Sequence, residues 1–187
     1  MNFIPSASQT VGPFFNFGLT ANSALGTLAG AGAAGERIWL KVRVTDGAGA
    51  PTPGDSMIEL WQADARGRYA HPMDLRAAEA DPNFRGFGRL ETDVNGVCTF
   101  QTVKPGPVDG AGAPHINVAV FARGLLKQLH TRIYFAGEPR NATDPVLALV
   151  PEERRATLLA NPIPGEANRW SIEIRLQGEA ETVFFEV

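Results

Sequence analysis

The chain has one cysteine, Cys98, and three histidines among its 187 residues. A single cysteine excludes a disulfide within the chain, and a free thiol fits a reducing compartment, so we expect a cytoplasmic protein. With so few cysteine and histidine side chains, no zinc-type ligand set can be assembled from the sequence. These scarcities favour a protein whose own chain holds no metal.

Long apolar runs and basic runs are missing as well. No stretch reaches the about 18 apolar residues that a membrane-spanning helix needs, and residues 1–5 show neither the basic nor the apolar part of a secretion signal. The net charge is −3, from 17 basic and 20 acidic residues. Nucleic acid and anionic membrane surfaces are therefore not expected as partners.

What the chain does contain is an excess of turn residues. Its 20 glycines and 14 prolines, with 44% hydrophobic and 20% charged residues, are typical of a folded, turn-rich β protein and exclude disorder. Alternating apolar residues and turn signals predict strands over 36–46, 57–61, 88–92, 97–103, 116–121, 129–135, 170–176 and 182–187. Pro151, two acidic residues and a closing Asn-Pro pair predict one short helix over 151–160.

Eight short strands with one helix predict an all-β fold, a β-sandwich. The pair Asn95-Gly96, between two of the strands, predicts a β-hairpin. Residues 1–35 are rich in turn residues, glycine and alanine, and they predict an extended N-terminal arm ahead of a single domain over 36–187. Exposure of Phe14, Phe15 and Phe17 to water would be costly, so the arm is expected to lie across its own domain or a partner.

Polar side chains on the strand 129–135 are the first candidates for chemistry. His130, Arg132 and Tyr134 alternate with apolar residues and therefore share one face of the strand. That face is either solvated surface or a binding face, on which Arg132 can grip a carboxylate with two parallel hydrogen bonds.

His115 and Asn117 also share a face, two residues apart on the strand before it. A second histidine at 117 would make a metal-ligand pair, but an amide is a weak ligand for a transition metal. Tyr69 with His115 gives two plausible ligands, too few to hold iron. The sequence shows no nucleophile elbow, phosphate-binding loop or dinucleotide fingerprint.

Several strings resemble the intradiol ring-cleaving dioxygenases, and they follow in the family's order over nearly the whole chain. They are residues 8–15 (Ser-Gln-Thr-Val-Gly-Pro-Phe-Phe), 58–69 (with Glu-Leu-Trp-Gln-Ala), 81–89, 102–107 (Thr-Val-Lys-Pro-Gly-Pro) and 113–116. The short length and the Thr-x-Gly-Pro arm are similar to those of a subunit, an alpha chain, that works beside a homologous beta chain. The resemblance implies a β-sandwich enzyme subunit that is not active alone.

The resemblance also implies a lost metal site. The family holds iron with two tyrosines and two histidines, and these map to four vestigial metal-site positions: Tyr69, Val108, His115 and Asn117. Two of the four have no suitable donor, so this chain is expected to bind no metal. The cofactor Fe(III) is then expected in the homologous beta subunit.

The implied reaction is the cleavage of 3,4-dihydroxybenzoate with O₂ to 3-carboxy-cis,cis-muconate, at an active site between the two chains. By the same resemblance, this chain supplies substrate-binding residues at the interface: Thr10, Gly12, Pro13, Phe14 and Arg132. Glycine allows the backbone to approach a flat ring, and proline fixes the turn. Arg132 is expected to attract or orient the substrate carboxylate, and the interface is expected to be large and apolar.

Two other classes of protein stay open. One is a metal-free β-sandwich binding module without catalysis, which would use the face of His130, Arg132 and Tyr134. The other is a self-sufficient metalloenzyme with a ligand set drawn from Tyr69, His71, His115 and His130.

Overall fold

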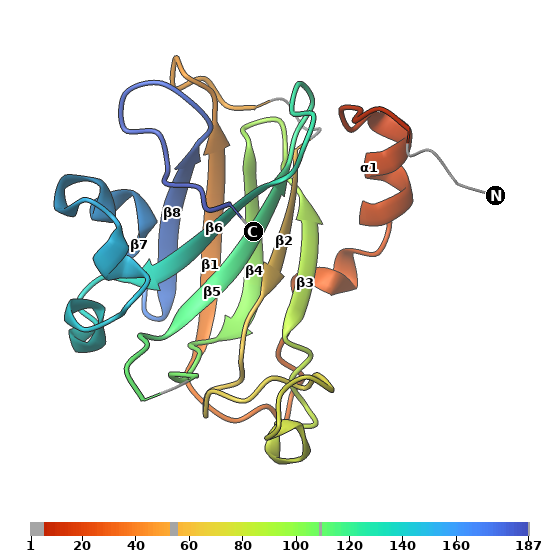
Figure 1. The fold of residues 1–187 in the computed structure, drawn as a ribbon. Helices are drawn as coiled ribbons and strands as arrows, with labels where there is room; N and C mark the ends of the chain where they lie inside the picture. Colours follow the sequence, from red (N-terminus) through yellow and green to blue (C-terminus); the bar gives the residue numbers. More distant parts are fainter. Residues whose placement is uncertain (1–5, 53–55, 109, 187) are drawn as a thin grey trace.

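The computed structural model describes residues 6–52, 56–108 and 110–186, and it is built around one sheet (Figure 1). Eight strands follow one another in the spatial order β3-β2-β5-β6-β7-β8-β1-β4. Their bounds are β1 Arg37–Thr45, β2 Met57–Trp61, β3 Phe87–Glu91, β4 Val97–Val103, β5 His115–Phe121, β6 Leu129–Phe135, β7 Leu159–Pro162 and β8 Arg169–Arg175. The all-β prediction is confirmed.

The sheet folds over on itself, so that two layers enclose the core. Strands β3, β2, β5 and β6 form one layer and β8, β1 and β4 the other, while β7 joins them by pairing with both β6 and β8. The alternation in β1 has the predicted effect, because Ile38, Leu40, Val42 and Val44 are completely buried between the layers. The opposite faces of the strands are left for solvent or for binding.

The Asn-Gly hairpin prediction is wrong, although the turn itself exists. Gly96 donates to the carbonyl of Asp93 (2.9 Å), and its φ of +71° would be strained for any other residue. The strands on either side do not pair with each other: β3 pairs with β2, and β4 pairs with β1. The turn carries the chain from one layer to the other because each strand finds a better-matched neighbour in its own layer.

The helix prediction for 151–160 is also corrected. The segment forms a 3₁₀ helix, η5, over Glu152–Leu158, and then runs directly into β7. Leu159 and Ala160 leave the helix because they pair in parallel with Tyr134 and Phe135 of β6. At 182–187 the expected strand is reduced to one bridge, between Phe185 and His130, and residue 187 lies outside the described residues.

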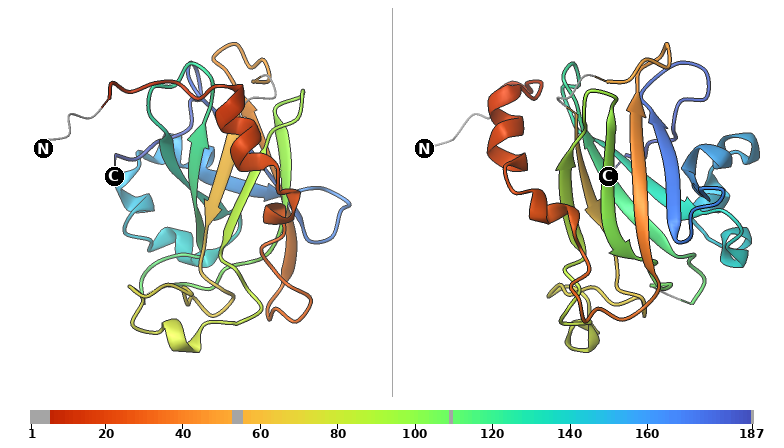
Figure 2. Two further views of the ribbon diagram at one scale, coloured as in Figure 1. Left: turned by 90° about the vertical axis from the view of Figure 1, so that its right-hand side faces the viewer. Right: turned by 180° about the vertical axis from the view of Figure 1, so that it is seen from behind.

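The N-terminal arm is less extended than predicted. It contains the α-helix α1, Pro13–Thr20, which lies alongside the edge strand β3 and stands off the sheet (Figures 1 and 2). Further along, Leu28 enters the main core, donating to Gln101 and accepting from Arg85 through its backbone. The division of the chain at residue 35 stays a prediction.

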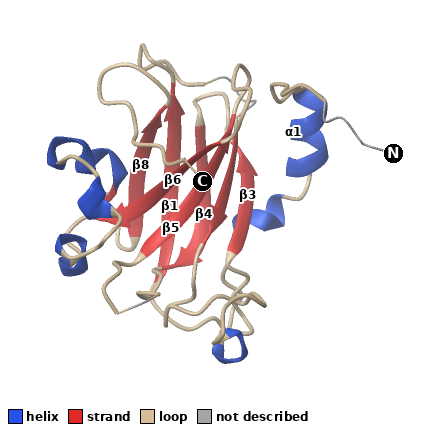
Figure 3. Cartoon of the chain, in the orientation of Figure 1, coloured by secondary structure: helices blue, strands red, loops and turns tan. Residues whose placement is uncertain are grey.

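The remaining helices are single 3₁₀ turns at the periphery of the strands (Figure 3). They are η1 Ser23–Gly26, η2 Ala77–Glu79, η3 Pro139–Ala142 and η4 Leu147–Leu149. Within the described part of the chain, no helix combines the length and the apolar character that crossing a membrane requires.

Candidate functional site

Three neighbouring strands place one row of side chains on the outer face of the first layer. Trp61 at the end of β2 lies opposite Asn117 of β5, and Asn117 lies opposite Arg132 of β6. Directly opposed residues of adjacent strands have Cβ atoms within about 5.5 Å, so these side chains must interact. The sheet register thus brings the predicted residues Asn117 and Arg132 together.

A chain of hydrogen bonds follows this row. The Nε of Arg132 donates to the Oδ1 of Asn117 (3.1 Å). The Nδ2 of Asn117 donates in turn to the hydroxyl of Tyr69 and to the main-chain carbonyl of Trp61, both at 3.4 Å. The indole of Trp61 stacks on the ring of Tyr69, with centroids 5.6 Å apart and planes 14° from parallel. Tyr69, Asn117 and Arg132 therefore form one connected polar cluster.

Two loops that are hydrogen-bonded to each other place Tyr69 and Val108 in the wall of the same pocket. Asp64 holds the first loop, since its Oδ1 accepts from the backbone of Arg66 and Arg68, while its carbonyl accepts from Gly106 of the second loop. At Gly67, φ is +75° and a Cβ would lie 1.9 Å from the carbonyl of the second loop, so only glycine fits. Two of the strings that carried the family resemblance, residues 58–69 and 102–107, are therefore in direct contact in the structure.

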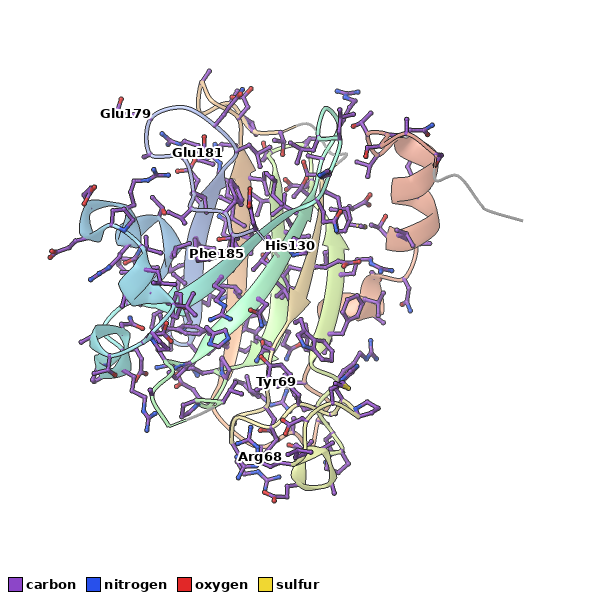
Figure 4. The ribbon with its side chains drawn as sticks, viewed as in Figure 1. Arg68, Tyr69, His130, Glu179, Glu181 and Phe185 are labelled. Carbon is purple, nitrogen blue, oxygen red and sulfur yellow. The ribbon has the colours of Figure 1, made fainter. Side chains whose placement is uncertain are left out.

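Two pockets open on either side of Trp61. One, of about 460 Å³, lies over the outer face of β2, β5 and β6, and its walls include Phe87, His130, Arg132 and Phe185. Its outer wall is formed by the C-terminal segment, since the backbone of Phe185 donates to the carbonyl of His130 (2.8 Å; Figure 4). Most of the pocket wall is apolar, and it also contains the guanidinium of Arg132 and the carboxylate of Glu59. Because Glu59 is paired with Arg89 (2.6 Å), the charge of Arg132 is left for a ligand, which suits an aromatic acid.

The second pocket, of about 580 Å³, is lined by Trp61, Tyr69, His71 and Val108 together with residues 73–76. Burial raises the pKa of Tyr69, and this effect outweighs the lowering by the Asn117 hydrogen bond and the Arg132 charge. The phenol is therefore neutral near pH 7, and its oxygen can accept from Asn117.

The vestigial metal-site positions lie in this region, and their donor set does not fit ferric iron. Val108 offers no donor atom, and both ends of the Asn117 amide are engaged in hydrogen bonds. His115 is buried beside Tyr134, and its Nδ1 donates to the carbonyl of Ala113 (2.9 Å). One phenol and one imidazole are too few protein ligands for the metal.

The reading as a self-sufficient metalloenzyme is not supported. Among the described residues, no three histidine, cysteine, aspartate or glutamate side chains come together at a distance that could hold a metal ion. His71 packs edge-on against Trp61, whereas His130 lies on the open face of β6. Figure 4 shows Tyr69 near the lower end of this layer and His130 higher on it.

The polar face predicted on β6 is interrupted at its last residue. Tyr134 is completely buried beneath residues 144–150, and its hydroxyl donates to the Oδ1 of Asp144 (3.0 Å). Burial raises its pKa to about 12. The expectation of a continuous exposed or ligand-binding face is therefore wrong for Tyr134. His130 and Arg132 are half-buried and line the pocket, and their role in binding stays a prediction.

The arm residues lie at a separate place, against the connection between β5 and β6. The Oγ1 of Thr10 accepts from the backbone of Gly124 (2.7 Å), and Thr10 and Gly12 line a different pocket, of about 540 Å³. No described atom lies within 4 Å of where a Cβ of Gly12 would be. Pro13 begins α1, and the side chain of Phe14 lies outside the described residues. Within this chain, the arm and Arg132 do not share one pocket.

The sequence analysis did not identify two residues that line the site, Trp61 and Phe185. Trp61 was noted only as part of a motif, although its place at the end of a strand two residues after Glu59 puts it on the outer face. Phe185 gave no signal, because its role depends on where the C-terminal segment crosses β6.

Comparison with known proteins places these features in a family. The family model described as "Dioxygenase" matches residues 11–178. The chain is 42% identical to the protocatechuate 3,4-dioxygenase alpha chain of Burkholderia cepacia, over 96% of each chain. It is 36% identical to the beta chain from the same organism, over 82% of this chain and 64% of that one. Among solved structures, a dioxygenase domain from Streptomyces sp. SirexAA-E matches with a TM-score of 0.62 and 27% identity, over 81% of this chain and 86% of that one.

Proposed function

The chain belongs to the family of intradiol dioxygenases, and we propose that it is the alpha chain of a protocatechuate 3,4-dioxygenase. The similarity to an alpha chain over nearly the full length of both proteins is the observation that carries this proposal. The similarity to a beta chain is lower and covers less of either protein. The partner we propose is accordingly a homologous beta subunit.

In this proposal the two chains divide the work. The donor set at Tyr69, Val108, His115 and Asn117 does not suit Fe(III), so we assign the iron, and with it the oxygen chemistry, to the beta subunit. The reaction is the insertion of both atoms of O₂ between the hydroxyl-bearing carbons of protocatechuate (3,4-dihydroxybenzoate), which yields 3-carboxy-cis,cis-muconate. This chain helps to bind and orient the substrate and to exclude water.

Arg132 is the residue of this chain that we assign to the substrate carboxylate. Its guanidinium is a permanent charge in the wall of a largely apolar pocket, where a charge-assisted hydrogen bond is stronger than in water. The arm residues Thr10, Gly12, Pro13 and Phe14 are proposed to cross near the partner's active site. The open space beside the backbone of Gly12 supports this role, because this chain does not fill it with its own described atoms.

The test is the kinetics of Arg132→Ala in the alpha–beta complex, produced from both chains together. We expect KM for protocatechuate to rise about tenfold or more, the effect of losing a hydrogen bond to a charged group, with a smaller change in kcat. An unchanged KM would overturn the assignment of Arg132. The exposed Arg85, changed to alanine, serves as the matched control and should leave KM unaltered.

A further inference from the structure

We infer that Asn117 is a positioning residue: the position of a lost metal ligand now holds the guanidinium of Arg132 in the orientation that receives the substrate carboxylate. The inference rests on the function proposed above and adds a second residue to it. It explains why an amide, rather than an apolar side chain, occupies the site of the missing histidine.

The register supplies the first step of the argument. Asn117 and Arg132 are directly opposed on adjacent strands, so their side chains leave the sheet at the same level. The hydrogen bond from Nε of Arg132 to Oδ1 of Asn117 fixes the plane of the guanidinium as well as its position. A guanidinium carries five donor hydrogens, so beside the bonds to Asn117 and to the hydroxyl of Tyr134 its terminal nitrogens keep donors with which to bind a carboxylate.

The second step is that Asn117 is itself held from the other side. Its Nδ2 donates to the phenol oxygen of Tyr69 and to the carbonyl of Trp61, and this fixes which end of the amide faces Arg132. Tyr69 is held in place by its stacking on Trp61, with ring centroids 5.6 Å apart. A side chain with both ends engaged cannot rotate freely, so it can impose its orientation on a long, flexible arginine.

The third step concerns charge. Asn117 is neutral, so it orients Arg132 without cancelling the positive charge that attracts the substrate. The hydroxyl of Tyr134 also hydrogen-bonds with the guanidinium, because its oxygen can accept from Arg132 while its proton goes to Asp144. The carboxylate of Glu59, in the wall of the same pocket, is paired with Arg89 (2.6 Å). A bound metal cation at the vestigial site would repel Arg132, so the loss of the metal and the gain of a placed arginine are compatible changes.

The experiment is a double-mutant cycle in the co-produced alpha–beta complex, with Asn117→Leu, Arg132→Ala and the double variant. Leucine has the same number and branching of side-chain heavy atoms as asparagine, although its methyl groups are bulkier, and it makes no hydrogen bond. We expect Asn117→Leu to raise KM for protocatechuate about threefold to tenfold, with kcat nearly unchanged. The double variant should be no worse than Arg132→Ala alone, because the two residues act as a unit.

Catechol, which lacks the carboxylate, separates positioning from a general structural effect. Asn117→Leu should leave KM for catechol unaltered, whereas a distorted pocket would raise KM for both compounds and overturn the inference. Tyr69→Phe removes one of the two bonds that hold the amide and should raise KM for protocatechuate about twofold. Asn161→Leu, an exposed asparagine of β7 on another part of the sheet, is the matched control and should have no effect.

The outcomes distinguish this inference from the proposed function. If Arg132→Ala leaves KM unchanged, the proposed role of Arg132 is wrong. The positioning role of Asn117 is then wrong as well, because it depends on Arg132. If Arg132→Ala raises KM but Asn117→Leu does not, Arg132 binds the carboxylate without help and only the positioning role is wrong. If the two single effects add in the double variant, the residues act independently and the inference is again contradicted.

Discussion

At the scale of single residues, the carboxylate of Asp144 holds the segment that covers the end of β6. It is almost completely buried, and it accepts hydrogen bonds from the backbone of Ala113 (2.8 Å), Val146 (3.0 Å) and Leu147 (2.8 Å), as well as from the hydroxyl of Tyr134. Each of these donors would be unsatisfied without it, because water does not replace a partner inside a packed core.

Asp144→Ala should therefore lower the free energy of unfolding by about 3 kcal/mol, and Tyr134→Phe, which removes one donor, by about 1 kcal/mol. The measurement is urea denaturation of the alpha–beta complex followed by circular dichroism. Glu153→Ala, at an exposed position in η5, should change the value by less than about 0.5 kcal/mol. Equal effects of the buried and the exposed variant would contradict this account of Asp144.

The same site predicts a pH dependence. Burial alone would raise the pKa of Asp144, but the hydrogen bonds from Leu147, Ala113, Tyr134 and Val146 outweigh burial and hold the pKa below its ordinary value. A carboxyl group with a lowered pKa in the folded state stabilises the fold fully above about pH 4, and the stabilisation is lost as the pH falls further. The difference in stability between the wild type and Asp144→Ala should accordingly shrink below that pH.

At the scale of elements, α1 is a short helix whose ends are not stabilised by capping or charge. It has no side-chain cap at Gly12, no acidic residue in its first turn and no basic residue in its last. Helices this short are marginal in water unless an apolar face packs against something. Phe17 is nevertheless 64% exposed, on a helix that stands off β3. A partner surface against α1 would bury this ring.

We expect Phe17→Ser to weaken the alpha–beta complex about tenfold, the equivalent of losing one buried phenylalanine ring. The dissociation constant can be measured by diluting the complex and following its mass distribution. Val94→Ser changes an equally apolar, 82% exposed residue in the turn between β3 and β4, and it should leave the dissociation constant unaltered. The role of α1 is contradicted if both variants weaken the complex to the same degree, or if neither does.

Most strands could be predicted from the sequence, because their burial pattern is local. The alternation of apolar and polar residues in β1 and β6 and the short apolar run of β2 place the ends of these strands correctly to within a residue. What the sequence could not show is how strands far apart in the chain pair, such as β1 in parallel with β8. The Asn-Gly turn was identified, but its strands pair elsewhere, and β7 was mistaken for the end of a helix because only contact with β6 makes it a strand.

The site was predictable to a similar extent. Tyr69, His115, Asn117 and Arg132 were identified from motifs, but the hydrogen bond between Asn117 and Arg132 depends on the register of β5 with β6. α1 was missed because Pro13-Phe14-Phe15-Asn16-Phe17-Gly18 has no polar face and a glycine in its interior, and this argues against a helix in isolation.

At the scale of the whole molecule, the proposed function treats the region around Tyr69 as the frame of a metal site whose donors are incomplete. The interlocked loops around Asp64 and Gly106 still bring Tyr69 beside Val108, and β5 still carries His115. The same strands also carry the row from Trp61 to Arg132 and the wall of the pocket beside it. In the function proposed above, the same fold serves a reaction centre in the beta subunit without holding a metal itself.

This division of labour predicts that the two remaining donors of this chain are dispensable for iron. In the alpha–beta complex, Tyr69→Phe should leave both the iron-to-protein ratio and the visible absorption of ferric tyrosinate unchanged, because Val108 offers no donor and the amide of Asn117 is engaged in hydrogen bonds. His115→Gln should likewise retain the iron, and it tests the same point at an independent position. Iron is measured by elemental analysis and the tyrosinate band by absorption spectroscopy, so neither readout depends on turnover. The complex of each variant should still assemble with the same mass. If such a complex loses iron, Tyr69 or His115 of this chain is an iron ligand, and the assignment of the metal to the beta subunit alone is contradicted.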